Sequence, residues 1–165
     1  EVLTKSVAMR ASRTISRPSM QPRTMLVLPM SIARSISLTS DLIELFQRSA
    51  NQPVSTKPVE LTKQRVAIRA KWMHEELEEF ISANDIYSQA DALTDLLYYL
   101  LGTYVEMGLK PDGLFSIVHR SNMMKIESSE GIIKDENGKV QKPSNWTHPD
   151  ISIKALIDHL QKAST

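Results

Sequence analysis

The sequence predicts an all-α protein built around an antiparallel pair of helices. Apolar residues recur at intervals of three and four over residues 63–81 and again over 88–107, which is the helical period. Ser82, Asn84 and Asp85 between them are typical of a turn, so the two helices should fold back on each other. The stripes expected to face the core are Val66, Ala70, Met73, Leu77 and Phe80 on the first helix and Leu93, Leu96, Leu97, Leu100 and Leu101 on the second.

Caps and helix breakers predict the elements before this pair. Asp41, with Glu44 three residues later, indicates the start of a helix that ends near Ala50. The loop that follows contains two prolines, which forbid helix continuation. Thr62 is placed to cap the long helix over residues 63–81.

Three further elements are expected after the pair. Gly108 and Pro111 end the second long helix, and Pro111 opens another that reaches the next turn. The Asn137-Gly138 dipeptide between short apolar stretches predicts a small hairpin. A last amphipathic helix is expected over residues 151–162.

Charge is distributed unevenly along the chain. The net charge is +1, but residues 1–40 carry a net +5 and residues 41–165 a net −4. The first segment is rich in Arg and Ser and poor in acidic residues, which is typical of an organellar transit peptide and predicts a mitochondrial protein. We expect an extended basic tail over 1–40, anchored on a partner by apolar residues 25–28, and a folded domain over 41–165. A disordered basic leader is the alternative.

Composition excludes several classes of protein. The chain has no cysteine, which excludes disulfides and zinc–thiolate sites. No apolar run approaches the roughly 20 residues of a membrane-spanning helix. Residues 1–40 contain no aromatic side chain, so nucleic-acid binding through base stacking is disfavoured despite their positive charge.

Two acidic clusters lie on the central helices. Glu75, Glu76 and Glu79 fall within roughly 100° of one helix face. Asp91 and Asp95, at i and i+4, share a face of the next helix. Facing carboxylates need a cation, protons or basic partners, and oxygen ligands alone suit Mg²⁺ or Mn²⁺. The alternative, a solvated acidic face, explains one cluster more easily than two of matched spacing.

These residues resemble a known enzyme superfamily. Glu75-Glu76-x-x-Glu79 followed by Asp91-Ala-Leu-Thr-Asp95-Leu-Leu-Tyr is similar to the all-α nucleoside triphosphate pyrophosphohydrolases, which include MazG and phosphoribosyl-ATP pyrophosphohydrolase. The resemblance implies a MazG-like antiparallel bundle. Further matches extend it over residues 41–152, at 96–103, 118–125 and 138–142.

The resemblance also implies an activity, the Mg²⁺-dependent cleavage of a nucleoside triphosphate into a monophosphate and pyrophosphate. Glu76, Glu79 and Asp95 match metal ligands. Glu75 matches a residue that orients or deprotonates the attacking water. Two more matched residues are expected near the substrate phosphates, Asn122 and Lys125.

One position departs from the superfamily pattern. The second motif is usually Glu-x-x-Asp, but Ala92 stands where the glutamate belongs. Asp91 lies about 40° from Asp95 around the helix and is the candidate replacement ligand. Two interpretations follow: an active pyrophosphohydrolase, or a catalytically weak or inactive relative serving as a structural subunit of a large mitochondrial complex. Wide apolar helix faces predict a homodimer or a larger assembly in either case.

Overall fold

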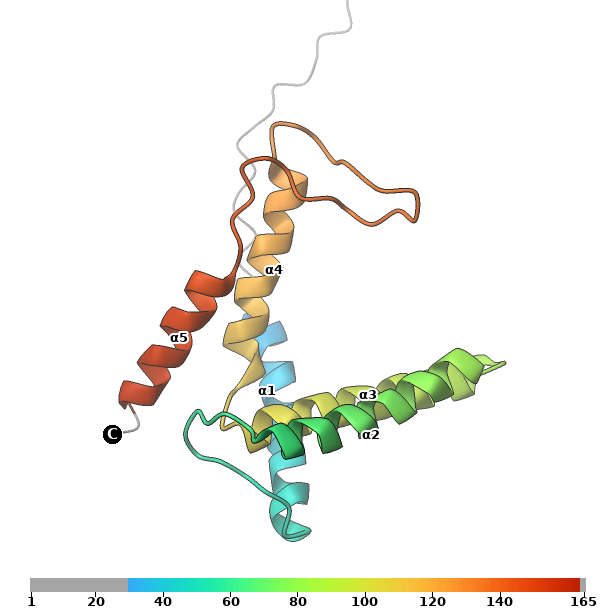
Figure 1. Cartoon of the computed structure of the whole chain (residues 1–165), viewed down its shortest axis with the longest axis vertical. Coiled ribbons are helices and arrows are strands. Elements are labelled where there is room, and N and C mark those ends of the chain that lie inside the picture. Colours follow the sequence, from blue (N-terminus) through green and yellow to red (C-terminus); the bar gives the residue numbers. More distant parts are fainter. Residues whose placement is uncertain (1–29, 164–165) are drawn as a thin grey trace, which may run out of the picture.

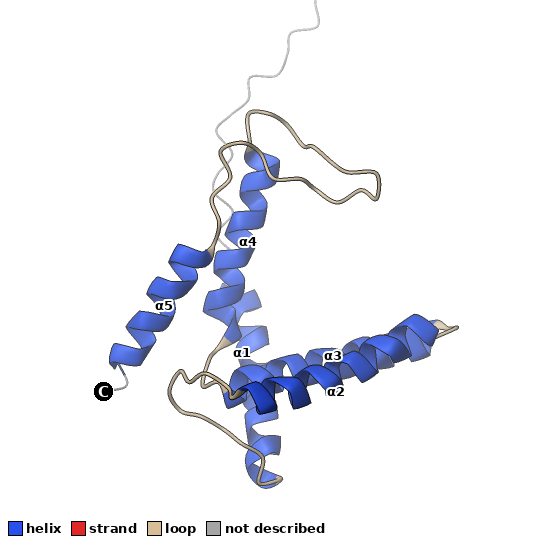
Figure 2. Ribbon diagram, in the orientation of Figure 1, coloured by secondary structure: helices blue, strands red, loops and turns tan. Residues whose placement is uncertain are grey.

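The computed structural model of the chain describes residues 30–163, and this part is helical (Figures 1 and 2). Five helices lie within it, and none is long and apolar enough to cross a membrane. The predicted all-α class is confirmed. The helices are α1 (Met30–Ser49), α2 (Lys63–Ser82), α3 (Ile86–Glu106), α4 (Pro111–Glu127) and α5 (Asp150–Ala163).

Helices α2 and α3 form the predicted antiparallel pair, and both begin at side-chain caps. Thr62 Oγ1 accepts a hydrogen bond from the Arg65 amide at 3.2 Å, and Asp85 Oδ1 accepts one from the Ser88 amide at 2.8 Å. Helix α1 packs on α3, α4 packs on α1, and α5 packs on α4. The far end of the pair, around residues 82–86, projects away from the other helices (Figure 1).

The first helix begins earlier than the sequence predicted. Helix α1 starts at Met30, so residues 30–40 are helical rather than extended, and the predicted cap at Asp41 is wrong. Asp41 lies inside the helix, where its carboxylate accepts a hydrogen bond from Lys110 Nζ at 2.5 Å. The predicted anchor at residues 25–28 and the transit-peptide interpretation fall largely on residues 1–29, outside those that the structure describes.

The predicted C-terminal hairpin is reduced to one bridge. Lys134 and Val140 form an isolated antiparallel bridge, and no strand occurs between residues 30 and 163. The turn itself is as expected, because Gly138 has a φ of +81° and the Asp135 amide donates to the Lys139 carbonyl at 3.0 Å.

At the start of α2 and the end of α3, the interface between the two helices is polar and contains a buried carboxylate. Arg65 donates to Glu106 through Nε at 2.7 Å and Nη2 at 2.6 Å, and Arg69 Nη1 lies 3.2 Å from Glu106 Oε1. The Glu106 side chain is 1% exposed. We call the row of residues that face each other between α2 and α3 the seam. Its members recur at helical spacing: Arg65, Arg69, Trp72 and Glu76 on α2, and Asp95, Tyr99, Gly102 and Glu106 on α3.

Arg69 crosses the seam because Gly102 leaves space for it. A Cβ at Gly102 would lie 2.7 Å from Arg69 Nη2, closer than a real side chain tolerates. Arg69 donates through Nε to Thr103 Oγ1 at 2.9 Å and through Nη2 to the Tyr99 carbonyl at 2.5 Å. One arginine thereby contacts three successive turns of α3.

The predicted apolar stripes are largely exposed, which corrects the expected core. Val66 is 50% exposed and Leu97 is 48% exposed, whereas Leu101 alone of the predicted α3 stripe is buried. The buried apolar cluster instead joins Leu101 and Val105 to Ile43 of α1. The helical period was identified correctly, but the seam, and not the apolar stripe, lies between α2 and α3.

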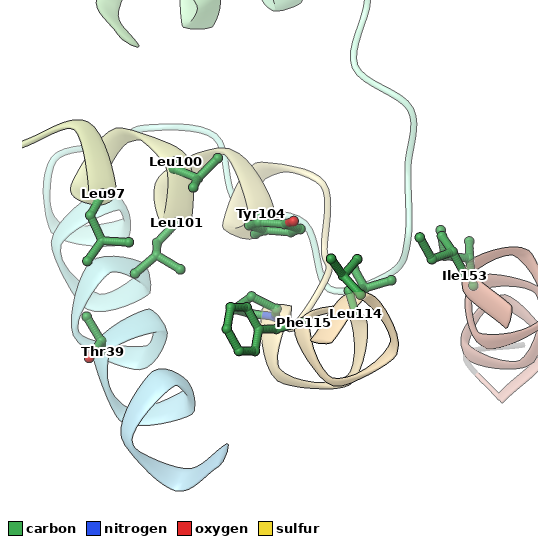
Figure 3. A pocket seen from close by; sticks show the side chains of 11 residues that line it. Thr39, Leu97, Leu100, Leu101, Tyr104, Leu114, Phe115 and Ile153 are labelled. Carbon is green, nitrogen blue, oxygen red and sulfur yellow. The ribbon is translucent and has the colours of Figure 1, made fainter. Parts of the chain in front are cut away.

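An apolar groove continues these exposed faces. It encloses about 450 Å³ between α1, α3, α4 and α5. Figure 3 shows Leu97, Leu101 and Tyr104 of α3 on one side and Leu114 and Phe115 of α4 on another. Contiguous exposed apolar surface of this kind is uncommon on a monomeric soluble protein.

A glycine after α3 fixes the loop that precedes α2. Gly108 has a φ of +64°, and a Cβ there would lie 2.1 Å from the Lys57 carbonyl oxygen. The same loop is held by hydrogen bonds from the Ser55 amide to the Val105 carbonyl at 3.2 Å and from the Val59 amide to the Met107 carbonyl at 2.9 Å.

Removing the charge of Glu106 should destabilise the fold. Glu106→Gln leaves two arginines facing a neutral amide in a buried place, and we expect the free energy of unfolding to fall by about 3 kcal/mol. Urea denaturation at one fixed protein concentration measures the loss. Asp158→Asn, which breaks the exposed pair with Lys154 on α5, is the control and should change stability by less than about 0.5 kcal/mol. Equal losses of stability in the two variants would show that the triad of Arg65, Arg69 and Glu106 does not hold α2 and α3 together.

Candidate metal and phosphate site

The candidate carboxylates lie on the seam, toward the projecting end of the helical pair. Glu76 lies one turn beyond Trp72 on α2, and Asp95 lies one turn before Tyr99 on α3. The Trp72 and Tyr99 rings meet across the seam with their centroids 5.7 Å apart. The two carboxylates are therefore the next pair along the same interface.

The pairing of α2 with α3 brings five carboxylates into one region. Burial raises the pKa of Glu76, and the negative charges of Glu79, Asp95, Glu75 and Asp91 raise it further, in that order. These groups come from both helices, so the antiparallel pairing brings the two acidic clusters of the sequence to one place.

Asp91 lies near the cluster, and Ala92 occupies the position of the missing glutamate. Ala92 is 2% exposed and is packed in the interior, whereas Asp91 is exposed. Asp91 still lies close enough to raise the pKa of Glu76. The second carboxylate of α3 is thus displaced by one residue along the helix and remains near the others.

Glu75 lies at the edge of the cluster. Its side chain is 54% exposed, and its Oε1 lies 3.4 Å from Lys71 Nζ. Glu78 is also exposed, lies 3.6 Å from His74 Nε2, and is not among the charges that act on Glu76. Glu75 is therefore accessible to a water molecule in the cluster, and Glu78 belongs to a different face of α2.

The donor chemistry fits a hard cation. All of the candidate ligands are carboxylates, which Mg²⁺ and Mn²⁺ prefer. Within residues 30–163, no three acidic or histidine side chains converge closely enough to enclose an ion as they stand.

Asn122 and Lys125 lie elsewhere in the single chain. Both are on α4, where Lys125 Nζ donates to Asn122 Oδ1 at 2.7 Å and lies 5.8 Å from the centre of the Trp146 ring. Helix α4 packs on α1 and α5 and rises away from the projecting end of the pair (Figure 1). One chain does not bring these two residues to the carboxylates.

Sequence reasoning missed a cavity beside the carboxylates. It encloses about 210 Å³ where α1 crosses α2 and α3. The sequence contains a signal for this cavity. Arg69 and Trp72 precede Glu76 by seven and four residues, so all three side chains share one face of α2. Its lining residues are Phe46, Gln47, Ala50, Gln52, Arg69, Trp72, Tyr98, Tyr99 and Gly102.

The helical pair with facing carboxylates defines a domain of the MazG-like all-α nucleoside triphosphate pyrophosphohydrolase superfamily, and comparison with known families agrees. The family model for phosphoribosyl-ATP pyrophosphohydrolase matches residues 40–122, just over half of the chain. The chain belongs to that family. The matched range includes both acidic clusters and ends within α4. No curated protein matches the chain.

Neutralising Glu76 should stabilise the metal-free protein. Its pKa is raised in the folded state, so folding is penalised at neutral pH and the penalty disappears as the pH falls through the raised pKa. We expect Glu76→Gln to increase the Tm by about 2 °C at pH 7 without divalent ions. The difference from wild type should shrink as the solution is acidified.

Differential scanning calorimetry over a pH series measures this effect. The matched control is Glu78→Gln on the same helix, which should leave the Tm nearly unchanged at every pH. A lower Tm for Glu76→Gln at pH 7 would contradict the clustering of charge around this residue.

Proposed function

We propose that the chain is a Mg²⁺-dependent nucleoside triphosphate pyrophosphohydrolase. The supporting observation is the group of carboxylates from α2 and α3 whose charges raise the pKa of Glu76, in a chain of the phosphoribosyl-ATP pyrophosphohydrolase family. In the proposed reaction, water attacks the α-phosphorus and the bond to the bridging oxygen breaks. The products are a nucleoside monophosphate and pyrophosphate.

Each carboxylate has a proposed role. Glu76, Glu79, Asp91 and Asp95 would hold the cation. A bound Mg²⁺ neutralises charge on phosphate oxygens and lowers the pKa of coordinated water. Glu75 accepts the proton of the attacking water, and its exposure beside the cluster supports this assignment.

Pyrophosphate release from a panel of nucleoside triphosphates tests the proposal. We expect turnover with Mg²⁺ or Mn²⁺ and none with EDTA. Glu76→Gln and Asp95→Asn should each lower kcat/KM by about 100-fold or more, because each removes a ligand of the cation. Glu78→Gln is the matched control and should retain the wild-type value.

The outcomes separate two kinds of family member. If wild type releases no pyrophosphate from any substrate and calorimetry detects no Mg²⁺ or Mn²⁺ binding, the enzyme proposal is wrong. The structural-subunit interpretation would then be favoured. Equal losses in Glu76→Gln and Glu78→Gln would instead show that the carboxylate cluster has no special role.

We also propose that the exposed stripes of α2 and α3 bind a second copy of this chain. Leu77 is 41% exposed, Leu93 is 47% exposed, and no other helix within residues 30–163 lies against the projecting end of the pair (Figure 1). Two copies can bury the same apolar stripe on each other about a two-fold axis. Such a dimer would bury apolar surface on a pair of helices that one chain leaves half covered.

Light scattering coupled to size exclusion tests the dimer. The wild-type chain should have twice the mass of one copy, and Leu97→Asp should shift it toward the monomer because a charge in an apolar interface is costly. Ile151→Asp is the matched control, since Ile151 is 79% exposed on α5 and lies outside the stripes. A monomeric wild type would refute this proposal.

A further inference from the structure

The cavity beside the carboxylates has the volume and the aromatic lining expected of a site for a planar ring. It encloses about 210 Å³, and aromatic side chains of α1, α2 and α3 line it. Phe46 and Tyr98 meet edge to face with their centroids 5.8 Å apart, and Trp72 lies on the same lining. Aromatic walls favour a planar, partly polar ligand.

One buried polar atom lacks a partner in this lining. Gln47 is 4% exposed, and its Nε2 donates to the Pro53 carbonyl at 2.8 Å. A carbonyl oxygen can only accept, so this bond fixes which end of the amide is nitrogen. Among the described residues, Gln47 Oε1 has no hydrogen-bond donor. A buried acceptor without a donor is uncommon, and the partner can be a ligand.

No described neighbour of Gln47 donates a hydrogen bond to its oxygen. Gly102 has no side chain, and a Cβ there would lie 2.8 Å from Gln47 Oε1. Arg69 is close by, but its nitrogens contact Tyr99, Thr103 and Glu106. Gln47 Oε1 and the Arg69 guanidinium thus both pack against Gly102, and a side chain at this position would clash with both.

The cavity and the carboxylates are adjacent along the seam. Trp72 precedes Glu76 by four residues on α2, and Tyr99 follows Asp95 by four residues on α3. Four residues rise about 6 Å along a helix, so one turn of each helix separates the cavity from the carboxylates. One nucleotide can place its phosphates at the carboxylates and its base in the cavity.

We infer that this cavity binds the nucleobase of the substrate, and that Gln47 Oε1 accepts a hydrogen bond from an exocyclic amino group. The position of the phosphates in this inference rests on the proposed function. An adenine or cytosine ring carries such an amino group, whereas hypoxanthine and uracil present a carbonyl oxygen at the same place. Two acceptors facing each other repel, so Gln47 selects amino-bearing bases.

Paired substrates that differ at this one group test the selection. For wild type we expect kcat/KM about tenfold higher for ATP than for ITP, and likewise for CTP than for UTP. Gln47→Met has a similar shape without the oxygen, and the ratio should fall to about one. Gln64→Met, an exposed substitution on α2, is the matched control and should keep the wild-type ratio.

A binding measurement makes the inference independent of catalysis. Trp72 lines the cavity, and Trp146 is the other tryptophan of the chain, so Trp146→Phe leaves one fluorophore to report on it. AMP and CMP should quench this fluorescence at lower concentration than IMP and UMP, by the same factor of about ten. The measurement also serves if Gln47→Met fails to fold, because it compares ligands on one protein.

The outcomes distinguish this inference from the proposed function. Hydrolysis with no preference between paired bases overturns the inference and leaves the proposed function standing. Selective quenching without hydrolysis supports the inference and overturns the proposed function. Absence of both overturns both, as does a crystal structure in which a side chain of a second copy fills the cavity.

Discussion

The ion pair between Arg65 and Glu106 sets the register of α2 on α3, and the candidate site depends on that register. Glu76 lies eleven residues after Arg65, and Asp95 lies eleven residues before Glu106. In an antiparallel pair these equal separations place Glu76 opposite Asp95. The contact between the Trp72 and Tyr99 rings, seven residues along each helix, lies between the two ends. A slip of one turn at the triad would misalign every pair along the seam.

A polar seam with apolar outer stripes reverses the usual arrangement of a helical pair. Buried ion pairs add little net stability, because desolvation of the charges offsets their attraction, but they discriminate strongly against a wrong pairing. The seam therefore provides alignment, and burial of the apolar stripes in the proposed dimer would add free energy of stabilisation. The seam thus aligns the two helices, and the apolar stripes on their other faces are available to stabilise them.

Local signals predicted much of this structure, and contacts between distant residues account for what was missed. The bounds of α2, its cap at Thr62 and the antiparallel pairing follow from period, cap and turn residues. The early start of α1 could not be predicted, because Asp41 resembles a cap but pairs with Lys110 far along the chain. Periodicity also identified an apolar face without indicating what covers it. The unpaired oxygen of Gln47 is a tertiary feature with no local signature.

The tight contact at Gly108 has a consequence for how the sequence can vary. The Lys57 carbonyl occupies the space of any side chain at this position, and the backbone there is left-handed. A replacement would push the loop before Thr62 outward and shift the start of α2, and with it the alignment of the carboxylates. Gly108 lies far from the site along α3, yet among natural variants it should tolerate exchange as poorly as a ligand does. Invariance at this residue would therefore report on backbone geometry and not on chemistry.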